Sequence, residues 1–370
     1  MNKKQVLRVI AFFVCVAIMV VGLCDLFEES NTENSNKRFY KFRNLRENTV
    51  DAVMVGTSGT DRYWIPSQAY EKYGMTVYPM STNSMPVFLY LNLIEEVYTY
   101  QNPELLIIDI RPFTQENTDT NRMDVKARLL LDVMEPFTVN RIKAAINTME
   151  AIKKVEPNKS SFDLSLFFSF IKFHSRWTEN GFRISRNLGD LEHNYLGFYI
   201  GNKMIKQVKQ TPTGYNPDNL GELDPICEEV LYILFDYIKE NDLKVLFFDS
   251  PQFRNEIDTG RANTVYSILE KEGYDYVHYY DENDPDGIKI DFDFDSDFYN
   301  NGHTNFYGAT KFTDAFSSFL HENYDLPDRR NDEDVKADWD GVQDALILKI
   351  QEIEQEKLLK ELAEQAKKAQ

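Results

Sequence analysis

The chain of 370 residues has only three cysteines, and their positions exclude a disulfide framework. Cys15 and Cys24 lie in an N-terminal apolar stretch, so Cys227 is the single cysteine of the remaining chain. Small domains that depend on disulfides carry several cysteines that can pair. This chain must therefore be stabilised by a hydrophobic core, for which 42% hydrophobic and 14% aromatic residues are sufficient. Export without disulfides fits a bacterial surface better than a eukaryotic secretory route.

Basic residues are scarce as well. The chain has 41 Lys and Arg against 60 Asp and Glu, which gives a net charge of -19. An acidic surface repels phosphate backbones, and the sequence contains no zinc-finger spacing or basic aromatic patch. We therefore do not expect nucleic acid as a partner.

A metal-binding pattern is also missing. Aspartates alternate with phenylalanines from Asp291 to Asp295, and Asp297 follows. A calcium loop of the EF-hand type would need a glycine inside the loop and a glutamate after it, and neither is present at the required place. We predict an exposed strand with one acidic face here, and we expect no metal or other cofactor.

Charge is absent from one long stretch near the N-terminus. Lys3, Lys4 and Arg8 precede residues 9–24, which carry no charge, and apolar residues continue to Phe27. About 20 apolar residues span a bilayer, so this segment is long enough for a single-pass anchor. Its basic flank predicts a cytoplasmic N-terminus and an extracytoplasmic body. A cleaved signal peptide and a lipoprotein signal at Cys24 are alternatives, but neither has the small residues that its cleavage requires.

Beyond a polar linker over residues 28–38, strands and helices are expected to alternate. Short apolar runs predict buried strands, and longer periodic runs predict helices. The predicted strands are 51–56, 76–80, 105–110, 244–249 and 275–279, and the predicted helices are 66–73, 86–100, 225–241, 262–272 and 304–320. Such alternation indicates a mainly parallel sheet covered on both faces, a three-layer α/β/α arrangement within residues 39–338.

Two segments depart from this alternation. Residues 114–224 look helical or irregular and rich in aromatics, so we predict an insertion that packs over one edge of the sheet. Residues 339–370 are rich in Glu, Lys, Gln, Leu and Ala and predict one long helix. This helix is either a solvated tail or a coiled-coil arm, and its apolar stripe extends over too few heptads to favour the second.

The first candidate for chemistry is Ser58, in the sequence Gly-Thr-Ser-Gly directly after the first strand. Ligands of parallel sheets gather beyond the carboxyl ends of the strands, so a serine hydroxyl here can face the crevice. Neighbouring backbone N–H groups could bind an oxyanion. An ordinary turn or helix cap explains the same four residues.

The second candidate is His303, which lies in a glycine-containing loop before the last predicted helix of the α/β part. Histidine accepts protons from serine hydroxyls at neutral pH. Asn300 and Asp297 precede it and could orient its ring. The alternative is a structural histidine at the start of a helix.

A serine after the first strand and a histidine before the last α/β helix occur in the order found in SGNH/GDSL hydrolases. The chain resembles this superfamily, and in particular its extracytoplasmic branch similar to the DltD and alginate O-acetylation (AlgJ/AlgX-like) proteins. Three further stretches carry the resemblance: Val-Tyr-Pro-Met-Ser-Thr-Asn-Ser-Met-Pro at 77–86, Phe-His-Ser-Arg-Trp at 173–177, and Leu-Pro-Asp-Arg-Arg at 326–330 followed by Trp-Asp at 339–340.

This resemblance implies a flavodoxin-like sheet and acyl chemistry on an exported glycopolymer. Ser58 would be the nucleophile and His303 the base. The oxyanion would be bound by groups of Ser58, Ser81 and Asn83. The implied partners are a cell-surface polysaccharide or teichoic-acid-like glycopolymer, and a multipass membrane acyltransferase that delivers the acyl group.

Three other residues are candidates for substrate binding. Arg111 follows the strand 105–110, and His174 and Arg176 belong to the insertion. A carboxylate or a sugar could bind to them, although a structural ion pair explains Arg176 as well.

The sequence departs from the family pattern at two positions. Asn300 stands where the family usually has an aspartate, and Ser81 stands where it usually has the oxyanion-hole glycine. An asparagine can orient the ring but cannot stabilise an imidazolium by charge. We therefore carry two main hypotheses, an O-acyltransferase or esterase and a catalytically weakened scaffold that binds glycan or a membrane partner. A structural surface protein that oligomerises through the C-terminal helix is a third.

Overall fold

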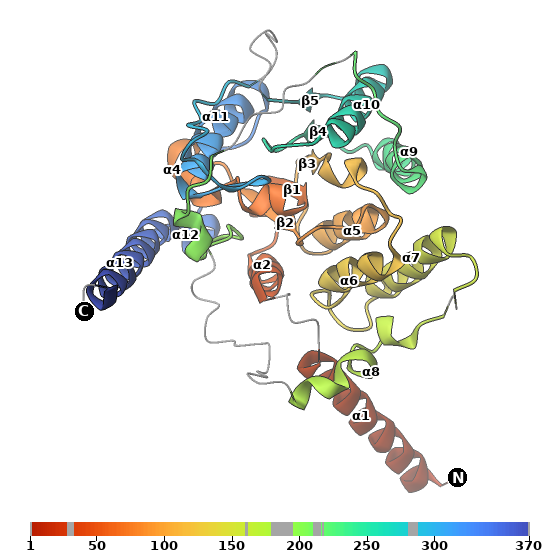
Figure 1. The fold of residues 1–370 in the computed structure, drawn as a ribbon. Coiled ribbons are helices and arrows are strands. Elements are labelled where there is room, and N and C mark those ends of the chain that lie inside the picture. Colours follow the sequence, from red (N-terminus) through yellow and green to blue (C-terminus); the bar gives the residue numbers. More distant parts are fainter. Residues whose placement is uncertain are drawn as a thin grey trace.

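The computed structural model describes residues 2–27, 33–159, 162–178, 195–209, 216, 218–279 and 288–368. At its centre lies a five-stranded sheet (Figure 1) in the order β2-β1-β3-β4-β5. All neighbouring strands pair in parallel. The strands are β1 (Ala52–Gly56), β2 (Val77–Ser81), β3 (Leu105–Asp109), β4 (Val245–Phe248) and β5 (Tyr276–Val277). The predicted α/β class and the mainly parallel sheet are therefore confirmed.

The two faces of the sheet are buried in two different hydrophobic clusters. Val53 and Val55 of β1 belong to one cluster, and Ala52 and Met54 belong to the other, because successive side chains of a strand point to opposite faces. Strands buried on both sides need apolar residues at every position, which is why each strand is a continuous apolar run.

Helices bury each face of the sheet. On the side of Val53, the helices are α5 (Tyr90–Tyr100), α9 (Pro225–Glu240) and α10 (Glu256–Glu272). On the side of Ala52 they are α4 (Pro66–Tyr73) and α11 (Phe306–Asn323). Pro66 starts α4, where its missing N–H costs nothing, and Gly74 ends it with a φ of 74°.

The described part of the insertion is largely helical, as predicted, and at Gly197 it packs against Tyr78 and Pro79 of the edge strand β2. Its elements are α6 (Thr120–Leu131), α7 (Val139–Val155), η3 (Leu164–Leu166), α8 (Phe170–Phe173), η4 (His174–Thr178) and η6 (Asn202–Ile205). Helices α6 and α7 pack on each other, and α7 packs on α5 and η1 (Val87–Leu89). The reason is that Met123, Ala127 and Leu130 of α6 complete the cluster that α5 begins.

The N-terminal segment forms one long helix, α1 (Lys3–Leu26). The most apolar window of this helix has a mean hydropathy of 2.8, and no residue of that window is buried. Within the described residues it is the one helix long and apolar enough to cross a membrane. The next helix, α2 (Glu33–Asn44), already begins inside the predicted linker, because Phe39 and Phe42 are buried in the core.

The single long helix predicted for residues 339–370 is formed as α13 (Val342–Lys368), and a further short helix, α12 (Glu333–Trp339), precedes it. Helix α12 ends before Gly341, which has a φ of 74°, and α13 follows. Trp339 is buried against Tyr70 of α4, with 5.5 Å between the ring centroids. Leu346 and Ile350 bury the first half of α13 against the body, and from Glu354 onward nearly every residue is exposed.

The acidic strand predicted at residues 291–297 is not formed. Asp293 accepts hydrogen bonds from the backbone N–H of Asp295 (2.9 Å) and from the hydroxyl of Ser296 (2.6 Å), so the segment turns on itself. Short polar side chains compete in this way with strand hydrogen bonding. A two-stranded antiparallel sheet follows, formed by β6 (Phe298–Asn300) and β7 (His303–Thr304).

Candidate active site

The candidate site lies at the carboxyl ends of the parallel strands. Ser58 follows β1, Asn83 follows β2, Arg111 follows β3, and Ser250 follows β4. The strand order reverses between β1 and β3, which is where ligands of open parallel sheets bind. The β6–β7 hairpin brings a further group of side chains to the same end of the sheet.

Ser58 and His303 are in direct contact. The Ser58 Oγ lies 2.7 Å from the His303 Nε2, although 245 positions separate the two residues. Ser58 begins the short helix α3 (Ser58–Asp61), which is capped by Thr57 through a hydrogen bond from the backbone N–H of Gly59. Both side chains of the pair are partly exposed, whereas their neighbours Thr57 and Thr304 are buried. The pair therefore lies at the border between the core and the surface.

Asn300 fixes the tautomer of His303. The Asn300 Oδ1 accepts a hydrogen bond from the backbone N–H of Gly302 at 2.9 Å, so this atom is an acceptor. The same oxygen lies 2.9 Å from the His303 Nδ1, which must then carry the ring proton. The Nε2 lone pair is left facing the Ser58 hydroxyl, as a general base requires. The three residues form one chain of hydrogen bonds.

The Asp297 carboxylate binds groups other than the His303 ring. Its carboxylate pairs with Lys311 at 2.8 Å and accepts a hydrogen bond from the backbone N–H of Asp293 at 2.6 Å. Its backbone carbonyl accepts from the N–H of Asn305, the N-cap of α11. Asp297 thus holds the start of α11 and the turn before β6, and it is Asn300 that orients the histidine.

Burial and positive charge keep His303 neutral. Burial is the first cause that lowers the pKa of His303 well below its ordinary value of 6.5, and the charges of Arg62, Arg111 and Lys203 lower it further. An imidazole must be unprotonated to accept a proton from serine. The surroundings therefore favour the base form at neutral pH.

Arg62 arranges one side of the site. Its Nη2 donates to the Asn83 Oδ1 at 3.0 Å, its Nη1 donates to the Tyr299 hydroxyl, and its guanidinium lies 4.3 Å from the centroid of the Tyr199 ring. Because arginine is only a donor, the Asn83 oxygen must face it, and the Asn83 NH₂ points elsewhere. Tyr299 in turn stacks on the His303 ring at 5.4 Å.

The other oxyanion candidates occupy different environments. Ser81 is fully buried, its Oγ donates to Asp61 at 3.0 Å, and its carbonyl accepts from Arg38 at 2.6 Å, so its side chain is structural. The backbone N–H of Ser58 is the first N–H of α3, where helices leave N–H groups without internal partners. The Ser58 N–H and the Asn83 NH₂ are thus candidate donors for an oxyanion.

Arg111 connects several segments of the site by hydrogen bonds. Its Nη1 donates to the carbonyl of Gly302 at 3.2 Å, its Nη2 donates to Ser250, and its backbone N–H donates to Asp109 at 3.0 Å. A Cβ on Gly59 would clash with Ser250 and approach the Arg111 guanidinium, so this position has no room for a side chain. The arginine joins the ends of β3 and β4 to the histidine loop.

Asp109 supports the residue that precedes the serine. Its Oδ2 accepts hydrogen bonds from the Thr57 backbone N–H at 3.1 Å and from the Thr57 hydroxyl at 2.7 Å. Burial raises the pKa of Asp109, whereas Arg111 and these hydrogen bonds act against the shift. Thr57, and with it Ser58, is thereby held at the end of β1.

His174 and Arg176 lie away from this group. They belong to η4, which follows α8 beside the C-terminal end of α1 (Figure 1). The His174 Nδ1 lies 3.0 Å from the carbonyl of Ile171, and the ring is exposed. The structure therefore brings Ser58, His303, Asn300, Asn83 and Arg111 together, and it places His174 and Arg176 in a different part of the molecule.

Sequence reasoning missed Arg62, Tyr299 and Ser250. Two of them could have been identified from their positions in the sequence, because Arg62 lies four residues after Ser58 and Ser250 directly follows the predicted strand 244–249. Tyr299 had no such signal, because its role depends on the hairpin that stacks it on His303.

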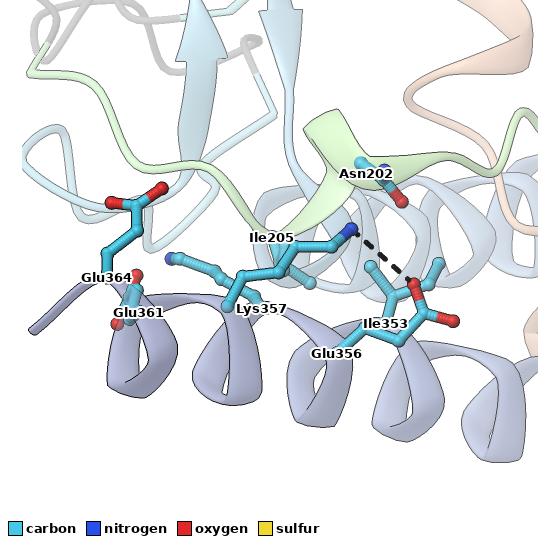
Figure 2. Close-up of a pocket in the computed structure, with 8 residues that line it drawn as sticks. Asn202, Ile205, Ile353, Glu356, Lys357, Glu361 and Glu364 are labelled. Carbon is cyan, nitrogen blue, oxygen red and sulfur yellow. Dashed lines mark ion pairs between the residues drawn. The ribbon is translucent and has the colours of Figure 1, made fainter. Parts of the chain in front are cut away.

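A separate pocket of about 210 Å³ lies between η6 and α13 (Figure 2). It is lined by Asn202 and Ile205 and by Ile353, Glu356, Lys357, Lys360, Glu361 and Glu364 of α13, with Lys360 4.0 Å from Glu356. No serine, cysteine or histidine lines it. Within the described residues, no group of three or more His, Cys, Asp or Glu side chains is placed to hold a metal ion.

Comparison with known proteins gives no assignment. No protein-family model matches the chain, and no curated protein matches it. Inferences about its function therefore rest on its own residues.

Proposed function

We propose that the protein is a membrane-anchored, extracytoplasmic serine O-acyltransferase or esterase of the SGNH type, acting on a cell-surface or exported polysaccharide. The hydrogen-bond chain Ser58–His303–Asn300 at the carboxyl end of β1 carries this proposal. The proposal includes a three-layer SGNH fold, which is supported by the strand order and by the burial of the sheet between two helical layers.

The residues can perform acyl transfer through two half-reactions. His303 Nε2 takes the proton of the Ser58 hydroxyl as Oγ attacks the carbonyl carbon of the acyl donor. The oxyanion that forms accepts hydrogen bonds from the Ser58 N–H and the Asn83 NH₂. The imidazolium then returns its proton to the leaving group, and an ester on Ser58 remains.

The second half-reaction repeats these steps with an acceptor. His303 removes a proton from a sugar hydroxyl or from water, whose oxygen attacks the Ser58 ester. Collapse of the second oxyanion breaks the bond to Oγ, and His303 returns the proton to Ser58. The choice between sugar and water decides between transfer and hydrolysis.

The proposed location follows from α1. The most apolar window of the helix is unburied, and Lys3, Lys4 and Arg8 at its start favour a cytoplasmic N-terminus. The body would then lie outside the cytoplasm, where a surface glycopolymer is the acceptor and a multipass membrane acyltransferase is the source of acyl groups.

One observation favours a second candidate function, a scaffold that binds glycan or a membrane partner without turnover. Asn300 supplies no negative charge to the imidazolium, and burial, Arg62, Arg111 and Lys203 all disfavour that cation. In serine proteases, replacement of the catalytic aspartate by asparagine lowers the rate by about 10⁴, chiefly because the catalytic histidine then takes the wrong tautomer. Here Gly302 corrects the tautomer, so we favour the enzyme.

A fluorophosphonate probe tests the proposal, because its phosphorus reacts with an activated serine and releases fluoride. We expect the full chain in detergent to be labelled, and we expect Ser58→Ala to remove the label. Ser267→Ala, on α10 and away from the site, is the matched control and should be labelled like the wild type. A folded wild-type protein that takes no label would support the scaffold instead.

A further inference from the structure

The insertion exposes an unusual number of large apolar side chains on its outer surface. Trp177 is 68% exposed, Phe162 63%, Leu164 49% and Ile171 41%, and all four belong to residues 162–178. Phe137 and Val139, in the turn before α7 and at its start, are also exposed. The Phe137 ring lies 5.9 Å from that of Phe168, so the two stretches adjoin each other. We name these six exposed side chains the insertion patch.

The insertion patch is fixed at the end of α1. Ser169 is buried, and its Oγ donates to the carbonyl of Cys24 at 2.9 Å. Helix α8 packs on α1 at this point and lies on the far side of α6 from the sheet (Figure 1). The patch therefore lies beside the C-terminal end of α1, where a helix that spans a membrane would leave the hydrocarbon layer.

Buried polar contacts hold residues 162–178 on α6. Arg128 is 1% exposed and donates to the carbonyl of Ser165 at 2.8 Å and to its hydroxyl at 2.7 Å. Lys172 pairs with Asp124 of α6. Because these contacts fix the backbone, the exposed aromatics belong to an ordered surface.

The charge of this region is opposite to that of the protein. Residues 120–178 contain ten Lys and Arg against six Asp and Glu, a net charge of +4, whereas the whole chain has -19. Basic residues beside a membrane are attracted to anionic lipid headgroups. Tryptophan and phenylalanine prefer the boundary between headgroups and hydrocarbon.

We propose that the insertion patch docks on the surface of the same bilayer that α1 crosses, with Trp177 at the level of the lipid headgroups. This inference rests on the anchor role of α1 in the proposed function, but not on catalysis. An apolar surface that lies beside an apolar helix, within a stretch of net positive charge, fits an anionic lipid surface. A peripheral contact of this kind would fix the orientation of the body relative to the membrane.

The three tryptophans make the proposal testable by fluorescence. Trp64 and Trp339 are at most 1% exposed, so Trp177 alone among the tryptophans is open to lipid. The full chain is reconstituted in vesicles of phosphatidylcholine and phosphatidylglycerol, with and without brominated acyl chains. We expect the bromine to quench the Trp177 contribution by about half or more, and its emission to lie at a shorter wavelength than that of an indole in water. Trp177→Phe gives the contribution of the two buried tryptophans, which should stay unquenched.

Matched charge variants separate the patch from the rest of the surface. Phe162→Asp together with Ile171→Asp should reduce the quenching of Trp177 severalfold, because both aspartates would have to enter the lipid. Ile257→Asp together with Leu358→Asp adds the same two charges at exposed positions on α10 and α13 and should leave the quenching unchanged.

Vesicle flotation separates a failure of the docking proposal from a failure of the membrane anchor on which it rests. Failure of the full chain to float with vesicles would refute the membrane anchor. Flotation without quenching of Trp177, in protein that the fluorophosphonate probe labels, would refute docking alone. A shorter emission wavelength without quenching would show that protein, such as a second copy or a membrane partner, covers the patch, and would equally overturn the proposal.

Discussion

At the scale of single residues, one amide oxygen decides whether the candidate site can work. The Asn300 Oδ1 receives the Gly302 N–H and the His303 Nδ1–H, and so leaves the Nε2 lone pair for Ser58. An asparagine that instead turned its NH₂ toward the ring would select the inactive tautomer. The backbone N–H of Gly302 prevents this, and orientation is preserved although charge is lost.

Asn300→Asp should therefore raise activity. A carboxylate in this place keeps the hydrogen bond to Nδ1 and adds a charge that stabilises the imidazolium, so the pKa of His303 should rise. We expect the rate of fluorophosphonate labelling at neutral pH to increase about tenfold or more. Asp297→Asn is the control, because its carboxylate contacts Lys311, and it should leave the labelling rate nearly unchanged. Slower labelling of Asn300→Asp would contradict the base role of His303.

The pH dependence of labelling tests the electrostatics of the site. Since the pKa of His303 is lowered, the base form persists below pH 6.5, and labelling should decline only at lower pH. Lys203→Gln removes one of the charges that lower this pKa, so the decline should move to higher pH. Lys206→Gln, at a neighbouring exposed position, should not move it. Identical pH profiles for wild type and Lys203→Gln would refute this account.

At the scale of secondary-structure elements, α2 joins the N-terminal segment to the site. Arg38 and Asp61 form an ion pair in which each side chain is 2% exposed, and Arg38 also donates to the carbonyls of Ser81 and Gly197. Asp61 is the last residue of α3, which Ser58 begins. A helix outside the sheet thus sets the position of the turn that holds the nucleophile.

Arg38→Met should be strongly destabilising, because it leaves the Asp61 carboxylate buried without its partner. Removal of one member of a buried pair costs about 3–5 kcal/mol in the free energy of unfolding. Arg46→Met is the matched control, since Arg46 pairs with Asp334 at the surface and should contribute about 1 kcal/mol or less. Urea unfolding measures both values, and equal values would show that the buried pair has no special role.

At the scale of the whole molecule, α13 attaches the C-terminus to the body. Leu346, Ile350 and Ile353 are buried in a third cluster with Ile65 and Met204, whereas Leu358 and the residues around it are exposed. The predicted solvated tail thus describes the second half of the helix, and the first half is part of the core.

Substitutions in the two halves of α13 should differ accordingly. Ile350→Ala should lower the free energy of unfolding by about 2–5 kcal/mol, because it leaves a cavity. Leu358→Ala, at a position 56% exposed, should change it by about 0.5 kcal/mol or less. Light scattering on both variants checks for association, and a large effect of Leu358→Ala would indicate that the exposed half is buried between two copies.

Much of the fold could be predicted from local sequence. Each strand is a short apolar run that ends at or directly before a polar residue or a glycine, and the α4 and α9 helices start at Pro66 and Pro225. The acidic segment before β6 was predicted wrongly, because side-chain capping by Asp293 outweighed the alternation of its residues. The packing of α7 on α5 and η1 could not be predicted, because which surface an amphipathic helix covers depends on the partner helix.

The sequence by itself determined the strands, most of the helices, the apolar N-terminal helix, and the placement of Ser58 at the end of the first strand. These features depend on the period and chemistry of neighbouring residues. Only the tertiary structure decided that His303 reaches Ser58, that Asn300 and not Asp297 orients it, and that Arg62 lies beside both. Contacts between residues as many as 245 positions apart follow from the packing of the sheet and its loops, which no local pattern encodes.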